Sequence, residues 1–386
     1  MNVLRSIREH EPLSRNARFA LLALVPIYFI VAGMVIQPVN EIIPGIINIF
    51  REPDFLITDY FLVGGIGAAL INAGILTLIS IGIIYYLGKE MDGHTITSCC
   101  LMFGFSLFGK NLLNIWTILF GVYLYAHYHK TAPSRYIYIG LYGTSLSPII
   151  TQVMQIDSVA VPLRFVMCIV VGVVIGFVLP PLATHVHYAH KGYSLYNVGF
   201  ASGIIATVIV SLLKSFGIET KARQIWATGY DRLFLVLLSI LFGGMILAGA
   251  LARGKEIWAS YRRILRTSGV SGTDYLADEG GASTIFNMGV NGLFATLFVL
   301  AVGGSLNGPT IGGIFTIVGF SATGKHLRNI APIMMGVVLA SMTKYWNISD
   351  PSPMLALLFS TTLAPIAGEF GVIAGLVAGY LHSSVA

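Results

Sequence analysis

The chain has 386 residues, of which 55% are hydrophobic and only 10% are charged, and its formal net charge is +6. Soluble domains carry about 25% charged residues, so this composition excludes an ordinary soluble protein and indicates an integral membrane protein. The positive charge does not indicate nucleic-acid binding, because the basic residues gather in loops beside apolar stretches. The three cysteines lack a CxxC spacing, so neither a disulfide framework nor a metal site is expected.

The first apolar stretch, 19–36, follows a basic leader without a small-residue cleavage site. We therefore expect an uncleaved anchor whose N-terminus is cytoplasmic, in the cell (inner) membrane. The next segment, 38–59, is amphipathic and acidic, which predicts an outer location. Further stretches approach the ~20 residues that a spanning helix needs: 61–88, 165–183, 193–213, 233–252 and 283–304. The sequence thus predicts an all-α integral membrane protein of about ten transmembrane or re-entrant helices.

The chain repeats itself at an offset of 215 residues, because 15 of the 32 positions in 93–124 are identical to those in 308–339. Shared hydrophobicity does not explain matched Gly, Lys and Asn residues. The most similar stretches are "GFSLFGKNLLNI" at 104–115 and "GFSATGKHLRNI" at 319–330. Weaker matches follow, such as "GVVIG" at 172–176 with "GLVAG" at 375–379. We therefore predict a duplicated transmembrane unit.

The charge of the loops predicts how the two copies are oriented. The basic loop 253–266 should be cytoplasmic and the acidic segment 38–59 should be outside, so the copies would be inverted. Inverted repeats are common in transporters, where the site lies at the repeat interface near the midplane. The loop 214–232 is also basic, although the count of spans places it outside. The predicted parts are an N-terminal anchor helix with the amphipathic outer segment (1–60), a first transmembrane repeat (61–217), a linking helix with the basic loop (218–281) and a second transmembrane repeat (282–386).

The repeated motif resembles a phosphate-binding loop, since Gly104, Gly109 and Lys110 have the required spacing. The residue after the lysine should be Ser or Thr to hold magnesium, but it is Asn111 in one copy and His326 in the other. A phosphate loop should also follow a strand of a soluble α/β unit, and the sequence predicts none. A nucleotide-binding function is therefore disfavoured, and no cofactor is expected.

Each repeated lysine lies between two short apolar arms, 94–109 and 111–126 in the first copy, which fit a broken helix or a re-entrant hairpin. The alternative is that the lysines extend to the membrane interface. An ionised lysine inside the membrane costs about 2.5–3.5 kcal/mol, so two such lysines in register favour a function. We expect Lys110, Asn114, Lys325 and Asn329 to converge on one central polar site. The candidate substrate-binding residues are Lys110, Asn114, Lys325, Asn329, Gly109, Gly324, Ser106, Ser321, Asn72 and Asn287.

Glu369 is the only charged residue in 351–386 and is therefore our candidate for ion or proton coupling. Lysine and asparagine side chains, together with backbone N–H groups at a broken helix, suit an anion or another oxygen-rich solute. They do not assemble a general base with a nucleophile, so no enzyme activity is expected.

The pairing of "DGHTI…GFSLFGKNLLNI" with "NGPTI…GFSATGKHLRNI", together with "HKGYSLYNVGFASG" at 190–203, resembles a bacterial membrane family of unknown function with a duplicated transmembrane domain. That resemblance implies a membrane location and the duplication, but no substrate. A fainter similarity links "GKNLLNIWTILFG" and "GYSLYNVGFASG" to urea channels, from which the chain departs by its two lysines and by an additional segment at 136–155.

The sequence predicts a transporter (permease) for a small polar solute, of which an anion is one candidate. Two alternatives stay open: a passive channel for a small neutral solute, and a membrane protein that transports nothing. The expected partners are the solute and the lipid bilayer, and a homo-oligomer is left open. No nucleic acid is expected to bind.

Overall fold

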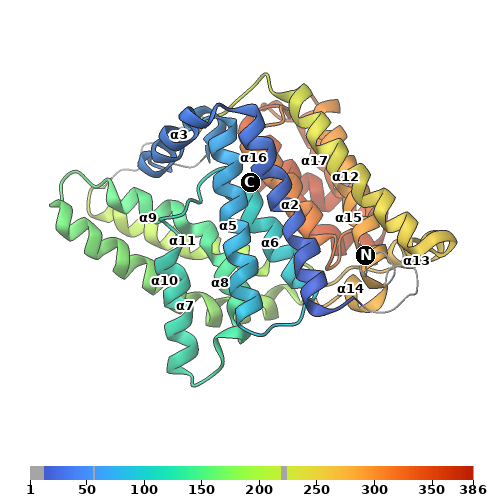
Figure 1. The fold of residues 1–386 in the computed structure, drawn as a ribbon, viewed down its shortest axis with the longest axis horizontal. Helices are drawn as coiled ribbons and strands as arrows, with labels where there is room; N and C mark the ends of the chain where they lie inside the picture. The colour runs from blue at the N-terminus through green and yellow to red at the C-terminus, as the bar shows by residue number, and fades with distance from the viewer. Residues whose placement is uncertain (1–12, 55–56, 219–223, 386) are drawn as a thin grey trace.

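The computed structural model describes residues 13–54, 57–218 and 224–385. This part of the chain is almost entirely helical (Figure 1), which confirms the all-α prediction. Arg5 and Arg8 of the basic leader lie outside the described residues. The α-helices are α2 (Arg15–Ile36), α3 (Val39–Arg51), α4 (Tyr60–Val63), α5 (Ile66–Tyr86), α6 (Gly93–Phe105), α7 (Trp116–Tyr128), α8 (Ile137–Gly143), α9 (Ser147–Met154), α10 (Val161–His190), α11 (Asn197–Ser215), α12 (Asp231–Arg253), α13 (Ile257–Ile264), α14 (Tyr275–Asp278), α15 (Gly280–Ala301), α16 (Gly308–Phe320), α17 (Leu327–Ser341), α18 (Pro351–Phe359), α19 (Ala364–Phe370) and α20 (Val372–Val385).

Short elements connect these helices. In the part of the chain that the structure describes, four of them are 3-10 helices: η1 (Pro133–Arg135), η2 (Thr144–Leu146), η3 (Gly254–Glu256) and η4 (Ser360–Leu363). Two strands of two residues each, β1 (Ile57–Thr58) and β2 (Gln224–Ile225), pair in parallel. This pairing places the described part of the loop 214–232 beside the segment that follows α3.

Within the described residues, seven helical segments are long and apolar enough to cross a membrane, so the chain is a helical membrane protein. Six of them contain or overlap the six apolar stretches predicted from the sequence, and the seventh is Pro351–Phe370, which joins α18, η4 and α19. By contrast, α6 and α16 have 13 residues each, or about 20 Å of helix. They are too short to cross a hydrocarbon core of about 30 Å.

The duplication is visible in the way that α6 and α16 begin. Asp92 caps α6 and Asn307 caps α16, and in both cases the side chain accepts the backbone N–H of a threonine three residues later. Each threonine hydroxyl is in turn hydrogen-bonded to the backbone N–H of its cap, so both helices begin with a capping box. Asp92 and Asn307 therefore start equivalent helices in the two copies.

Small residues let equivalent helix pairs pack closely in both copies. A side chain at Gly176 of α10 would meet the Ile118 carbonyl of α7 at 2.1 Å, and one at Gly379 of α20 would meet the Ile333 carbonyl of α17 at 2.0 Å. Only glycine permits such close approach of two helix backbones. The matched glycine stretches 172–176 and 375–379 thus allow close packing of the equivalent helix pair in each copy.

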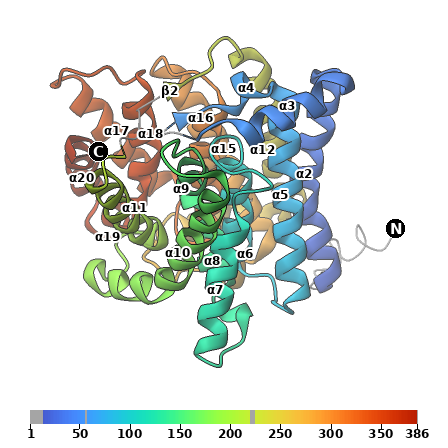
Figure 2. The same ribbon diagram turned by 90° about the vertical axis from the view of Figure 1, so that its left-hand side faces the viewer.

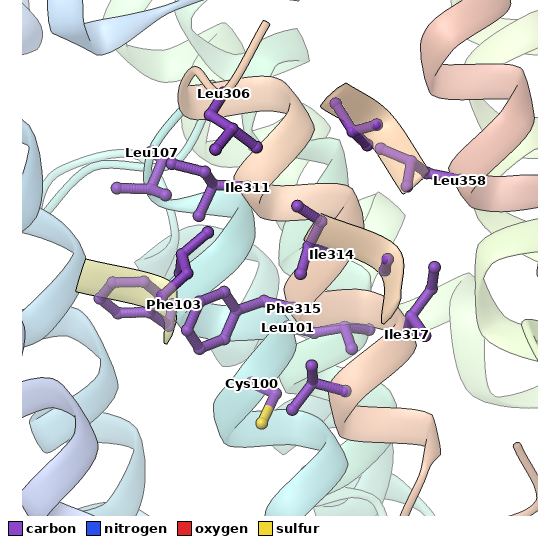
Figure 3. Close-up of a cluster of buried hydrophobic side chains, with 14 of the residues drawn as sticks. Cys100, Leu101, Phe103, Leu107, Leu306, Ile311, Ile314, Phe315, Ile317 and Leu358 are labelled. Atoms are coloured by element: carbon purple, nitrogen blue, oxygen red, sulfur yellow. The ribbon is translucent and has the colours of Figure 1, made fainter. Parts of the chain in front are cut away.

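At the centre of the molecule α6 and α16 lie side by side and run in opposite directions (Figure 3). The start of α6 is close to the end of α16, because a side chain at Gly93 would meet Thr323 at 2.5 Å. Further along, one at Gly104 would meet Gly312 at 2.8 Å. Cys100, Phe103 and Phe315 are among the apolar side chains that fill this interface (Figure 3). The loops that follow the two helices therefore lie at opposite ends of the pair.

Candidate functional site

Each copy of the motif is a loop that follows a short helix and contains a glycine with positive φ. Gly109 has φ +95° and Gly324 has φ +140°, a region that favours glycine. The lysine after each glycine donates its backbone N–H to the last residue of the helix, Phe105 at 3.2 Å in the first copy and Phe320 at 2.9 Å in the second. Both helices therefore end four residues before the glycine, and the chain turns at the glycine itself. We refer to residues 106–115 as loop 1 and to residues 321–330 as loop 2.

The chain reverses its direction at loop 1. The hydroxyl of Tyr138, at the start of α8, donates to Asp92 at the start of α6 at 2.8 Å. Helix α7, which lies between loop 1 and α8, thus returns the chain to the end of the molecule where α6 began. In Figure 2 α7 extends away from α3 and α4, toward the opposite end. The two apolar arms form a hairpin rather than one broken helix.

An asparagine from the preceding long helix holds each loop. The Asn72 side chain of α5 donates to the carbonyls of Ser106 at 2.8 Å and of Lys110 at 2.9 Å. The Asn287 side chain of α15 donates to the carbonyls of Ser321 and Lys325, both at 2.8 Å. The side-chain hydroxyls of Ser106 and Ser321 in turn donate to carbonyls one turn earlier, those of Met102 and Ile317. These four predicted site residues therefore fix the backbone that carries the lysines.

The asparagines four residues after the lysines close their own loops. The Asn114 amide donates to Gly109 at 3.0 Å, and the Asn329 amide donates to Gly324 at 2.9 Å. Their side-chain oxygens accept the backbone N–H groups of Asn111 and His326. The expectation that both asparagines meet at one central site was wrong, because the antiparallel arrangement of α6 and α16 places them in loops at opposite ends.

Both lysine side chains are buried, with 1% of Lys110 and 0% of Lys325 exposed. The Lys110 ammonium lies 3.6 Å from the Met102 sulfur and 3.5 Å from the Leu141 carbonyl. The Lys325 ammonium donates to the hydroxyls of Tyr196 and, at 2.7 Å, of Thr361. None of the ion pairs found among the described residues includes either lysine. The two buried lysine side chains therefore have no carboxylate partner among the described residues.

Five aromatic rings, which we call the aromatic cluster, lie between the two lysines. They are Phe105, Tyr142, Tyr196, Phe320 and Phe359. Lys110 lies 5.1 Å from the centre of the Phe105 ring, and Lys325 lies 4.3 Å from that of Tyr196 and 5.4 Å from that of Phe320. These distances are within cation–π range. The two lysines do not meet directly, but both face one cluster built from both halves of the chain.

The rings form a continuous path across the molecule. Phe105 of α6 stacks on Phe359 of α18 with 5.9 Å between the ring centres, and the ring centres of Phe359 and Tyr196 are 6.3 Å apart. The ring centres of Tyr196 and Phe320 of α16 are 4.8 Å apart, and Phe320 stacks on Tyr142 of α8 with 6.3 Å between the ring centres. Because α6 and α8 belong to the first copy and α16 and α18 to the second, the cluster lies between the copies.

Glu369, the predicted coupling residue, is exposed near the end of α19. It is not among the side chains that contact either lysine. Several buried polar atoms around the loops lack a hydrogen-bond partner in the described part of the chain: Asn72 Oδ1, Asn111 Nδ2, Asn291 Oδ1 and His326 Nδ1. Buried polar atoms are normally paired, so these positions have an unused capacity for water or a polar solute.

Sequence reasoning missed two aspartates that link the copies. Asp59, which caps α4, accepts the backbone N–H of Ala227 at 3.1 Å and that of Gly308 at the start of α16. Asp274, which caps α14, accepts the backbone N–H of Gly93 at the start of α6 at 3.0 Å. Each aspartate thus holds the first turn of the short helix in the other copy. The tripeptide Thr-Asp-Tyr occurs at 58–60 and again at 273–275, so extending the 215-residue alignment upstream would have found them.

A family model described as "Protein of unknown function (DUF1576)" matches residues 38–215 and 253–386. The chain belongs to this family. The two matched segments correspond to the two halves that carry loop 1 and loop 2. No curated protein and no solved structure matches the chain, so the similarity to urea channels stays a prediction.

Proposed function

We propose that this protein is a membrane transporter for a small polar solute with an anionic group, and that the solute binds at the aromatic cluster between Lys110 and Lys325. The supporting observation is the pair of equivalent, buried lysines without a carboxylate partner. An ammonium group held inside a membrane costs about 2.5–3.5 kcal/mol on insertion scales. A bound anion would offset that cost through charge-assisted hydrogen bonds.

We further propose that the two copies are inverted with respect to the membrane. The antiparallel contact of α6 with α16 supports this arrangement, since it places loop 1 and loop 2 at opposite ends. In transporters built from inverted repeats the solute binds where the repeats meet, near the midplane. The aromatic cluster takes side chains from both copies, which supports a binding site where the repeats meet.

The aromatic rings have a second role in this proposal. A cation on the face of an aromatic ring is stabilised by about 0.5–2 kcal/mol, depending on how far it is desolvated. The rings would therefore partly compensate the lysines when no solute is bound. A bound anion would replace one contact between a ring and the ammonium group with a direct ion pair. The free energy of that ion pair is then partly offset by the lost ring contact, so the solute is bound weakly enough to be released again, as transport requires.

Binding of simple anions to the purified protein tests the proposal. We would measure the thermal unfolding midpoint in detergent with acetate, succinate, phosphate, sulfate and urea, because a ligand that binds only the folded state raises it. At least one anion should stabilise the wild type, and both Lys110→Met and Lys325→Met should lose this stabilisation. Lys255→Met is the matched control, since Lys255 is exposed in η3. Equal stabilisation of all four proteins would contradict the proposal, and stabilisation by urea alone would favour the channel.

Uptake into liposomes then separates transporter from channel. The anion identified by its stabilising effect would be supplied outside vesicles that contain the protein, with and without a proton or sodium gradient. Accumulation above the external concentration, driven by a gradient, is expected for a transporter. A flux that only equalises the two concentrations would support the channel alternative.

A further inference from the structure

A buried carboxylate lies beside loop 1. Asp54, between α3 and α4, has only 1% of its surface exposed. Its side chain accepts hydrogen bonds from the Tyr60 hydroxyl at 2.8 Å, from the Thr151 hydroxyl at 3.1 Å and from the Asn114 amide at 3.3 Å. The same Asn114 amide donates to the carbonyl of Gly109, the residue before Lys110. A short chain of contacts therefore links Asp54 to the loop that carries Lys110.

The second copy has no such carboxylate. At the 215-residue offset the residue equivalent to Asp54 is Gly269. Gly269 lies against loop 2, where a side chain would meet the Gly324 carbonyl at 2.0 Å and the Asn329 amide nitrogen at 2.9 Å. Loop 2 is thus held by direct contact with the backbone of Gly269, whereas loop 1 is held by a hydrogen bond to the titratable side chain of Asp54. This is a clear chemical difference between two loops whose asparagine and serine side chains make equivalent hydrogen bonds.

Solvent comes close to Asp54 through a cavity of about 340 Å³ between α3, α9 and α10. Thr151, which binds Asp54, is part of the wall. The remaining wall residues are Phe50, Arg51, Glu52, Met154, Gln155, Asp157 and Arg164. The wall is polar and carries both signs of charge, so it can hold water and pass a proton to the side chain behind it.

We propose that Asp54 is a proton-binding site reached from the solution on the α3 side of the molecule, and that protonation of Asp54 releases loop 1. An ionised carboxylate accepts all three of its present hydrogen bonds, whereas a protonated carboxyl becomes a donor at one oxygen. The hydroxyls of Tyr60 and Thr151 can rotate and accept that proton, but the Asn114 amide nitrogen cannot. Protonation also removes the negative charge that strengthens all three bonds, so the bond from Asn114, the longest of the three, is the one that it weakens most.

The surroundings of Asp54 place its titration near neutrality. Burial is the main reason that the pKa of Asp54 is raised from 3.8 to about 7; the nearby Glu52 carboxylate adds to the rise, and the hydrogen bonds from Tyr60, Thr151 and Asn114 oppose it. Arg51, Arg164 and Asp157 are the other charged groups of the cavity wall. If the binding of this proton is coupled to the movement of a solute, that coupling rests on the proposed transport function. Proton binding and the release of loop 1 can be measured without any solute.

Proton binding has a thermodynamic signature. The pKa of Asp54 is higher in the folded protein than in the unfolded chain, so the folded state binds the extra proton between pH 3.8 and about 7. The resulting stability is complete at low pH and is lost as the pH rises through about 7. The unfolding midpoint of the wild type should therefore fall between about pH 5 and pH 8, and Asp54→Asn should show a smaller fall. Burial also raises the pKa of Asp59 to about 7, so a residual slope remains in Asp54→Asn.

The control for this measurement is Asp157→Asn. Asp157 is part of the same cavity wall, but 99% of its side chain is exposed. In this variant the unfolding midpoint should fall with pH as steeply as it does in the wild type. A slope that is the same in wild type and Asp54→Asn would overturn the proposal, because Asp54 would then not bind a proton in this range.

Release of loop 1 can be followed by thiol labelling of the purified protein. Leu113→Cys reports on loop 1, and the equivalent Arg328→Cys reports on loop 2, since both positions are exposed and differ by 215. The native cysteines are buried. The ratio of the two labelling rates at one pH cancels the effect of pH on the thiol itself. The ratio should rise about fivefold between pH 8 and pH 5, as expected for one lost hydrogen bond.

In Asp54→Asn the labelling ratio should stay at its acidic value at every pH. A ratio that does not change with pH in the wild type would overturn the proposal. A pH-dependent ratio in a protein that binds no anion through its lysines would instead leave the proton site intact and contradict the proposed function. The two proposals therefore fail by different measurements.

Discussion

The two buried lysines occupy equivalent positions but have different immediate partners. Lys325 donates to two hydroxyls, those of Tyr196 and Thr361, whereas Lys110 has only a methionine sulfur and a carbonyl oxygen at 3.5–3.6 Å. The Lys110 ammonium is thus the less satisfied cation and has more to gain from an anion. We expect Lys110→Met to weaken anion binding more than Lys325→Met does, which titration of each variant with the stabilising anion would measure.

The asparagines on the long helices give a prediction about stability. Asn287→Ala removes two hydrogen bonds and leaves the buried carbonyls of Ser321 and Lys325 without these donors. A buried group that loses its partner costs about 1–3 kcal/mol, so the variant should be less stable by about 2–4 kcal/mol. Chemical unfolding in detergent would measure this change. Asn347→Ala, at an exposed position after α17, should change stability by less than about 0.5 kcal/mol.

At the scale of elements, the short helices α6 and α16 are each held at both ends. A capping box within the same copy forms the first turn, and an aspartate from the other copy accepts one of its free N–H groups. At the far end, an asparagine of α5 or α15 holds the loop. A helix of about 13 residues is marginal by itself, so these contacts fix its position in the fold.

The two aspartates should differ in importance. Asp59 is fully buried and accepts N–H groups from Phe61, Ala227 and Gly308, whereas Asp274 is half-buried. Asp59→Ala should therefore destabilise the protein by about 3 kcal/mol or more, because three buried donors lose their acceptor. Asp274→Ala should cost about 1–2 kcal/mol, as is typical of a lost helix cap. Equal losses in an unfolding experiment would contradict this ranking.

Close packing of helices gives a second prediction at this scale. Gly379→Ala would place a methyl group 2.0 Å from the Ile333 carbonyl, so α17 and α20 must separate. We expect a destabilisation of about 1–3 kcal/mol, the usual cost of overpacking. Gly243→Ala in α12 is the control, since nothing lies within 4 Å of the added atom. It should be neutral or stabilising by up to about 1 kcal/mol, because alanine favours helix. Thermal unfolding of both variants would test the contrast.

At the scale of the whole molecule, the sequence predicts structure that depends on residues close together in the chain, but it does not predict contacts between helices that are far apart in the chain. The alignment of the two copies identifies the repeated loops around Lys110 and Lys325, because the shape of each loop depends on residues close together in the chain. It does not predict that Phe105 stacks on Phe359, a contact that depends on how α6 and α18 are placed relative to each other in the fold. Helix α16 is buried on all sides, so its pattern of apolar residues indicates no particular face.

Orientation in the membrane is the property on which the transport proposal depends most. Helix α3 and the segment η3–α13 are equivalent at the 215-residue offset and lie at opposite ends of the molecule (Figure 1). Their charges differ: α3 carries Glu41 and Arg51, whereas η3 and α13 carry Arg262 and Arg263 with Lys255 and Glu256. Basic loops stay in the cytoplasm during insertion, so α13 should face the cytoplasm and α3 the outside.

Single cysteines at Glu41 and Lys255 test this orientation, since both positions are exposed and the native cysteines are buried. In intact cells a membrane-impermeant thiol reagent should label Glu41→Cys, and it should label Lys255→Cys only after the membrane is opened. The inverted arrangement requires this difference, because the two segments are the same element in the two copies. Labelling of both cysteines in intact cells would mean that the copies are parallel, and a solute site between them could not then be exposed to each side in turn.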